Sequence, residues 1–275
     1  MKTLLVPVDF SQASDNATRY AVELSKFMHA RLVLFHVFYI PVVAADAAIV
    51  VPAMDDLEKN AMQRLQVIRE AILQRKDYTP DVECACVSGF AVDEIGRFAE
   101  ECKADLIVMG MQGAGFLSEQ FIGSVTTSVL RTCSCPVLAI DRKVSFKPLE
   151  KIVLACDYKH ISKSLLWPLK DLARVFDAQV SILHVVDEAL REEMDLEVAL
   201  KDLQLDDSFR QLDYSCHFVS ATDVVDGIND YVDRMGMDLI MMIPRKKSLL
   251  ATLFAEPDTK RMAFHTHVPL LTLHE

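Results

Sequence analysis

LLVPVDF (residues 4–10) recurs 148 residues later as IVLACDY (residues 152–158), so the segment that opens the chain is present twice. An internal repeat of this length predicts two structural units with the same fold. Asp9 of the first copy corresponds to Asp157 of the second. Three further segments repeat: LVLFHVF (32–38) as VSILHVV (180–186), ADLIVMG (104–110) as MDLIMMI (237–243), and CPVLAI (135–140) as VPLLTL (268–273).

The boundary between the two copies falls in DRKVSFKPLE (141–150), a charged stretch that contains a proline and has no apolar period. A chain of 275 residues also favours two domains over one. We therefore expect an N-terminal domain at residues 1–142 and a C-terminal domain at residues 150–275.

Each copy alternates short apolar runs with amphipathic helical segments. Such runs, rich in Val, Leu and Ile, are typical of strands buried on both faces, and their alternation with helices predicts a parallel sheet covered by helices on both sides. The sequence thus predicts an α/β fold of two tandem five-stranded parallel-sheet sandwiches. Pro168 lies in the expected first helix of the second copy, so that helix should start late or kink. The expected strands of the first copy are 3–8, 31–38, 82–87, 105–110 and 136–140.

Composition excludes several classes of function. The formal charge of −11 disfavours binding to nucleic acids and to anionic membranes, and no apolar run is long enough to span a bilayer. The N-terminal apolar run is too short for a secretory signal, so we expect a cytoplasmic protein. Seven cysteines, an odd number, fit reduced thiols better than a disulfide framework.

The carboxyl ends of the strands are where an open parallel sheet binds ligands. Three segments of the first copy should meet there, one after each of the first, second and fourth strands. They are Pro7-Val8-Asp9, Val37 and Met109-Gly110.

Glycines follow the fourth strand with the spacing G-x2-G-x9-G-S, at Gly110, Gly113 and Gly123 before Ser124. The first two could permit positive φ and let backbone amides approach an anion. The third opens a helix whose free N–H groups would favour phosphate, with Ser124 suited to the N-cap. The spacing is neither a Walker A loop nor a GxGxxG fingerprint.

At this point the sequence resembles the universal stress protein family, as a tandem, UspA-like member. The resemblance rests on VDFS at 8–11, HV at 36–37 and the glycine spacing, and it extends over both copies. It implies an adenine nucleotide alpha hydrolase-like, Rossmann- or flavodoxin-like fold, with ATP bound together with Mg²⁺.

The resemblance also implies the role of each site residue. Asp9 and the backbone of Val37, beside Pro7 and Val8, would meet adenine or ribose. Met109, Gly110 and Gly113 would line the ribose and the first phosphates. The outer phosphates would be held by Gly123, Ser124, Val125 and Thr126.

The second copy departs from this pattern, because its residues would crowd a phosphate site with side chains, a carboxylate and a proline that lacks an N–H. We therefore expect one nucleotide per chain, in the N-terminal domain. The replacements are Gly110 by Ile243, Gly113 by Lys246, Gly123 by Glu256 and Ser124 by Pro257.

Simpler explanations compete with these roles. The glycines could serve turns only, and Asp9 could cap a helix as well as bind a ligand. His36 and His184 are better explained as structural residues than as catalysts. A zinc site is disfavoured for Cys84-Ala-Cys86 and Cys133-Ser-Cys135, because we expect their side chains to point to opposite faces of a strand. The cluster of His265, His267 and His274 is a weak metal candidate.

No catalytic constellation is apparent, so we do not expect an enzyme, although slow ATP hydrolysis or autophosphorylation at Ser124 or Thr126 stays open. The first hypothesis is an ATP-dependent stress-response regulator that changes its contacts with a protein partner through the loop at 111–122. The alternative is a nucleotide-independent scaffold, a pseudo-dimer whose halves pair through 135–140 and 268–273. Further pairing into a homodimer is also plausible.

Overall fold

The computed structural model describes residues 2–39, 54–75, 80–112, 123–156, 166–187, 212–243 and 267–273. Its first half contains β1 (Lys2–Pro7), α1 (Gln12–Met28), β2 (Ala30–Phe38), α2 (Met54–Leu73), β3 (Val82–Ser88), α3 (Ala91–Glu101), β4 (Leu106–Gly110), α4 (Ser124–Thr132) and β5 (Val137–Ile140). Its second half contains β6 (Lys151–Ala155), α5 (Trp167–Phe176), β7 (Gln179–Asp187), β8 (Tyr214–Ala221), α7 (Val224–Met235), β9 (Leu239–Met242) and β10 (Leu270–Thr272).

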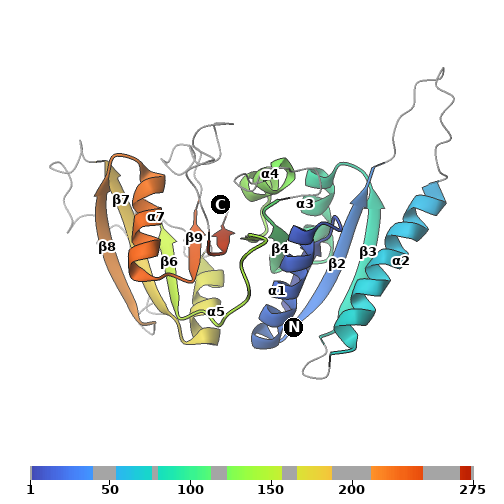
Figure 1. Cartoon of the computed structure of the whole chain (residues 1–275), viewed down its shortest axis with the longest axis horizontal. Coiled ribbons are helices and arrows are strands. Elements are labelled where there is room, and N and C mark those ends of the chain that lie inside the picture. Colours follow the sequence, from blue (N-terminus) through green and yellow to red (C-terminus); the bar gives the residue numbers. More distant parts are fainter. Residues whose placement is uncertain are drawn as a thin grey trace, which may run out of the picture.

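The strands form one continuous ten-stranded sheet in the order β3-β2-β1-β4-β5-β10-β9-β6-β7-β8 (Figure 1). Each half is a parallel five-stranded sheet, as predicted, and the two halves join at β5 and β10. These two strands run antiparallel, with Leu271 opposite Leu138. The pairing expected between 135–140 and 268–273 is therefore confirmed, and the halves form one sheet rather than two separate ones.

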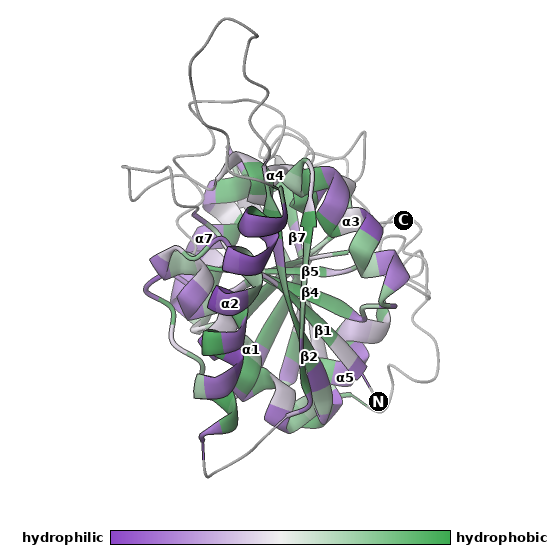
Figure 2. Ribbon diagram, turned by 90° about the vertical axis from the view of Figure 1, so that its right-hand side faces the viewer, coloured by the Kyte–Doolittle hydropathy of each residue, from purple (hydrophilic) through white to green (hydrophobic). Residues whose placement is uncertain are grey.

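Helices cover both faces of the sheet, because alternate residues of each strand point to opposite sides. Leu4 and Val6 belong to the buried cluster beneath α1, α2 and α5, whereas Leu5 belongs to the cluster beneath α3, α4 and α7. Figure 2 shows hydrophobic strands at the centre and a largely hydrophilic outer face on α2. The core therefore extends as two layers through the whole sheet.

The connection between the halves is fastened at both ends. Two carbonyl oxygens at its start, those of Asp141 and Val144, accept hydrogen bonds from Asn16 Nδ2 at 2.9 and 2.8 Å. At its end Asp238 Oδ2 accepts the N–H groups of Glu150 and Lys151 at 2.8 and 2.9 Å. The connection is therefore held against both halves.

Pro168 has the effect predicted from the sequence. Helix α5 begins at Trp167, so the proline occupies the first turn, where its missing N–H breaks no helical hydrogen bond. The equivalent helix α1 begins at Gln12, whose counterpart at the repeat offset is His160, seven residues before Trp167. The late start is therefore confirmed, without a kink in the described helix.

Candidate functional site

A pocket of about 310 Å³ lies at the carboxyl ends of β1, β2 and β4. The sheet order reverses there, because β1 has β2 on one side and β4 on the other. Ten of the eleven residues proposed from the sequence line this pocket, and the eleventh, Gly113, lies outside the described residues. The predicted convergence is therefore observed. The ten are Pro7, Val8, Asp9, Val37, Met109, Gly110, Gly123, Ser124, Val125 and Thr126.

The turn between β1 and α1 forms one wall. Val8 N–H donates to the Phe35 carbonyl at 2.8 Å, and Phe10 then takes the left-handed conformation with φ of 63°. Ser11 is the N-cap of α1, and its Oγ accepts the Ser14 N–H at 3.2 Å. The exposed Asp9 instead accepts the Ser11 N–H at 3.0 Å. The suggestion that Asp9 caps the helix is therefore wrong, because the cap lies two residues later.

Gly110 is required by the packing of α1 as well as by the pocket. A Cβ at this position would lie 2.7 Å from the carbonyl carbon of Ala13 and 2.8 Å from its oxygen. The expectation of positive φ at Gly110 is wrong, since among the described glycines only Gly89 and Gly236 have it. This glycine therefore lets the first turn of α1 approach the end of β4.

Helix α4 forms the opposite wall, and its N-cap is Gly123 rather than the predicted Ser124. Gly123 N–H donates to the Met111 carbonyl at 2.6 Å, so this amide is not available to a ligand. Ser124 is instead the first residue of the helix. The amides of Ser124, Val125 and Thr126 have no intrahelical acceptor, as in any first helical turn, and line the pocket as anion donors.

The hydroxyl groups of α4 differ in access. Thr126 is buried, and its Oγ1 donates to the Gly110 carbonyl at 2.8 Å. Ser124 is exposed. Thr126 therefore holds α4 to the end of β4, and Ser124 is the more accessible hydroxyl.

His36 connects the ends of β1 and β2. Its Nδ1 lies 2.6 Å from the Val8 carbonyl, and its ring lies 4.6 Å from that of Phe10. The guanidinium of Arg64 lies over the ring of Phe10, 3.7 Å from its centre. Burial lowers the pKa of His36, so the neutral ring donates from Nδ1 to Val8. This is the structural role expected for the histidine.

Gln112 also lines the pocket, although no motif of the sequence indicates it. Its Nε2 donates to Asp141 Oδ2 at 2.8 Å. Its Oε1 is buried and has no hydrogen-bond partner in the described part of the chain. The spacing of the glycines gave no signal for a specific residue between Gly110 and Gly113. The other lining residues not proposed earlier are Ser14, Phe35, Ala91 and Ile95.

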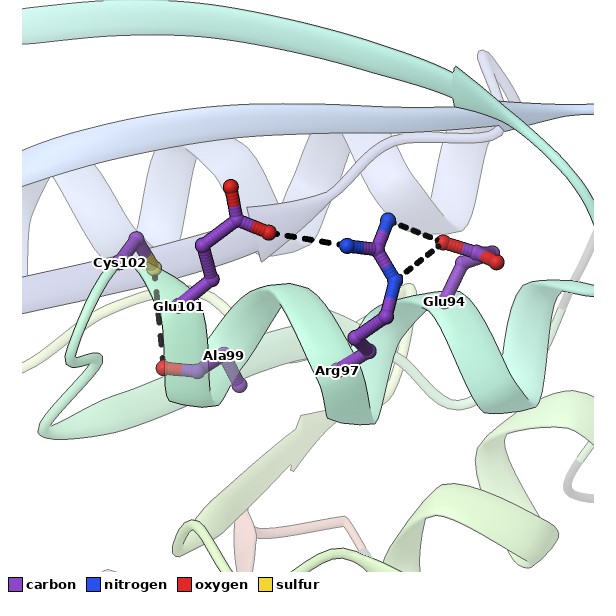
Figure 3. Close-up of polar contacts among 5 residues, drawn as sticks. All are labelled: Glu94, Arg97, Ala99, Glu101 and Cys102. Atoms are coloured by element: carbon purple, nitrogen blue, oxygen red, sulfur yellow. Dashed lines mark hydrogen bonds and ion pairs between the residues drawn. The ribbon is translucent and has the colours of Figure 1, made fainter.

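No lysine or arginine is found among the described residues that line the pocket, where Asp9 is the one carboxylate. Helix α3 contributes Ala91 and Ile95 to the lining, but its Arg97 is not part of the lining. Arg97 pairs with Glu94 at 2.6 Å and with Glu101 at 2.9 Å along the helix (Figure 3). An anionic ligand would therefore depend on backbone amides and on a cation that it brings with it.

The cysteine pairs lie differently from the prediction. Cys84 and Cys86 pack against one hydrophobic cluster, and Cys133 and Cys135 belong to the other, so each pair shares a face. The expectation of opposite faces was wrong for Cys84 and Cys86, because residues i and i+2 of a strand point the same way. Cys133 and Cys135 do not lie in a strand, since Cys133 is the C-cap of α4 and β5 begins only at Val137. Burial raises the pKa of the thiols of Cys84, Cys86, Cys133 and Cys135, which disfavours reactive thiolates. No group of three or more potential metal ligands occurs within the described ranges.

The remaining candidate residues lie partly outside the described residues. His267 lies 3.0 Å from Asp233 in an ion-pair geometry. The described helices include none long and apolar enough to cross a membrane. Outside the described residues lie His265, His274, Asp157, Lys246, Glu256 and Pro257.

Comparison with known proteins identifies relatives of both sequence and fold. The model of the universal stress protein family matches residues 1–141. Universal stress protein MJ0531 of Methanocaldococcus jannaschii is 28% identical over 142 residues, which cover 51% of this chain and 82% of that protein. Universal stress protein Sll1654 of Synechocystis is 30% identical over 139 residues, which cover 50% and 85%.

A solved structure resembles the whole chain. The universal stress protein from Archaeoglobus fulgidus aligns with a TM-score of 0.72 at 18% identity, covering 99% of this chain and 96% of that one. At this identity the likeness concerns the fold, and it includes both halves.

Proposed function

Because this chain belongs to the universal stress protein family, we propose that it binds one ATP in the pocket of its N-terminal half and acts as a cytoplasmic stress-response regulator. The observation that carries this proposal is the convergence of ten residues, chosen from the sequence, on one pocket at the reversal point of the sheet. Adenine and ribose would occupy the side of Asp9 and Val37. The phosphates would face the first turn of α4.

The residues present fit a triphosphate bound without lysine or arginine. Three amides at the start of α4 point their donors at one end of the pocket, and the helix dipole adds to their field. A divalent cation such as Mg²⁺ would neutralise the remaining charge of the phosphates. We propose binding and release rather than catalysis as the function, with Ser124 as the accessible hydroxyl if phosphoryl transfer occurs.

The second half would not bind ATP in the same way. Ile243 replaces Gly110 and is buried, with only 3% of its surface exposed. Its side chain belongs to the cluster that contains Leu166 and Leu169 of the α5 region. At the position where the first half needs a glycine to let α1 approach β4, the second half has a buried isoleucine side chain, which supports one nucleotide per chain.

A nucleotide-independent scaffold is the second candidate, favoured by the junction between the halves. In addition to the β5–β10 pairing, the ring of Phe27 lies 4.8 Å from that of Phe176, and Phe146 contacts both. Lys2 and Asp171 form an ion pair across the same junction. None of these residues lines the pocket, so the pseudo-dimer could present a fixed surface to a partner whether or not a nucleotide is bound.

Calorimetry with ATP and Mg²⁺ separates the two functions. We expect one site per chain in the wild type, no binding in Gly123→Glu, and unchanged binding in Gly96→Glu. The first substitution introduces at the N-cap of α4 the residue that the second copy has at this position. The control adds the same charge on α3, where a Cβ meets nothing within 4 Å.

Two results would contradict the proposal. Unchanged binding by Gly123→Glu would place the nucleotide elsewhere. An absence of binding by the wild type at millimolar ATP, after release of any co-purified nucleotide has been excluded, would leave the scaffold as the better account.

A further inference from the structure

Only one of the two polar atoms of the Gln112 side chain has a hydrogen-bond partner among the described residues, and Gln112 lines the pocket. Its Nε2 donates to Asp141 Oδ2 at 2.8 Å, but its Oε1 is buried and lacks a partner among the described residues. An unpaired buried acceptor is unfavourable and is commonly explained by an ion, a water or a ligand that completes it. The oxygen can therefore accept a hydrogen bond from a ligand or bind a cation.

The orientation of the Gln112 amide is fixed by Asp141, which is itself held by hydrogen bonds. Asp141 Oδ1 accepts the Lys143 N–H at 2.8 Å, and the Asp141 carbonyl accepts from Asn16 Nδ2 at 2.9 Å. Because a carboxylate can only accept, the amide must turn its nitrogen toward Asp141 and its oxygen away. Gln112 therefore presents an acceptor and not a donor on its free side.

An acceptor at this position does not suit a phosphate directly. Gln112 follows Gly110 by two residues and lies in the lining that also contains the start of α4, the proposed phosphate end. A phosphate oxygen and an amide oxygen would repel each other, whereas a cation between them would bind both. Amide and carboxylate oxygens are the ligands that Mg²⁺ takes beside phosphates, with one or two protein groups per ion.

The charge of the pocket leads to the same requirement. The described lining contains no lysine or arginine, and residues 113–122 (GAGFLSEQFI) contain none in the sequence. The charge of a triphosphate must therefore be balanced by an ion, and a protein oxygen that favours this ion would make binding selective for the metal complex. Since such an ion needs few protein ligands, the absence of a larger ligand cluster in the described ranges is compatible with it.

We propose that Gln112 Oε1 is the protein ligand, directly or through one bound water, of the divalent cation that accompanies the nucleotide phosphates. Gln112 would thereby make the pocket select the metal complex of ATP over free ATP. This inference rests on the proposed function, because it concerns the same site. Gln112 is not one of the residues of the G-x2-G-x9-G-S spacing, so this role is additional to that motif.

The test compares nucleotide affinities with and without metal in wild type, Gln112→Met and Gln112→Glu. Calorimetry is run with ATP and Mg²⁺, with ATP and EDTA, and with AMP and EDTA. In the wild type Mg²⁺ should strengthen ATP binding. In Gln112→Met this gain should shrink by about tenfold, as losses around a metal ion typically do, while the two EDTA affinities stay within about twofold. Gln112→Glu keeps an oxygen that can bind the ion but loses the hydrogen bond to Asp141, so its gain from Mg²⁺ should lie between those of the wild type and Gln112→Met.

A second readout does not depend on affinity. When Mn²⁺ replaces Mg²⁺ in the ATP complex, the side-chain amide of Gln112 should be broadened more than that of any other side-chain amide, because the effect falls steeply with distance from the ion; stronger broadening of another side-chain amide would contradict the assignment. Urea unfolding of each variant establishes that it is folded before binding is compared.

The outcomes separate this inference from the proposed function. If Gln112→Met weakens ATP equally with and without Mg²⁺, the oxygen contacts the nucleotide itself, for example a ribose hydroxyl, and the metal role is wrong. Equal gains from Mg²⁺ in wild type and Gln112→Met would also overturn it, while ATP binding by the wild type would leave the proposed function intact. A wild type that binds no ATP under any condition would overturn both.

Discussion

Replacing Gly110 by alanine tests whether this glycine serves the packing of α1 independently of any nucleotide. The new Cβ would lie 2.7 Å from the Ala13 carbonyl carbon and 2.9 Å from its Cβ. Carbon atoms in contact normally stay about 3.5–4.0 Å apart, so α1 or β4 must move by nearly 1 Å. The atoms met first belong to the backbone of a helical turn and cannot rotate away. We expect Gly110→Ala to lower the free energy of unfolding by about 1–3 kcal/mol, the usual cost of overpacking.

Urea unfolding of nucleotide-free protein, followed by circular dichroism, measures this loss. Gly96→Ala is the matched control, because a Cβ there has no neighbour within 4 Å and the residue is in the interior of α3. It should stabilise the protein by about 0.5–1 kcal/mol, since alanine is the better helix former. If Gly110→Ala unfolds within about 0.5 kcal/mol of the wild type, the close approach of α1 is relieved without cost and the packing argument is wrong.

Two further predictions concern pH. Burial lowers the pKa of His36, so as pH falls below about 6.5 the unfolded state binds a proton before the folded state does, and the protein loses stability. Urea unfolding at pH 7.5 and 5.0 should show this loss, and the loss should be smaller in His36→Gln. The pKa of Asp238 is lowered although burial opposes this, because Lys147 and the N–H groups of Glu150 and Lys151 donate to the carboxylate. The contribution of this carboxylate to the free energy of unfolding should be lost as pH falls below about 4. Asp238→Asn should therefore lower the free energy of unfolding by about 1–3 kcal/mol at pH 7 and make it depend less on pH below 4.

The strands could be predicted because strands of a buried parallel sheet are short apolar runs rich in Val, Leu and Ile. The run expected at 31–38 is β2 (Ala30–Phe38), and the run expected at 136–140 is β5 (Val137–Ile140). The site followed from topology, since residues such as Asp9 and Met109 leave their strands at the same edge of the sheet. The pairing of the last strands followed from the resemblance to the universal stress protein family together with the repeat, which supplies both partners within one chain.

The details that failed depend on single residues and on tertiary contacts. Asp9, Ser11 and Ser124 are all good N-cap residues, and only the backbone path shows that the caps are Ser11 and Gly123. The role of Gly110 depends on how closely α1 approaches β4, a distance that has no counterpart in the local sequence. Gln112 was missed for the same reason, because its partner Asp141 is 29 residues away.

The described part of the second half differs from the first at the start of the helix that corresponds to α1. Helices α1 and α5 end at equivalent positions, followed by His29 and Asp177 in the left-handed conformation. Their starts differ, because Pro168 corresponds to Tyr20 in the middle of α1 and is tolerated only in a first turn. Ile243 acts in the same direction, since a side chain there would collide with a helical turn placed like that of Ala13. Both substitutions therefore affect the place where, in the first half, α1 approaches the end of β4, and we expect Ile243→Gly alone not to create a nucleotide site in the second half, which calorimetry on that variant would show.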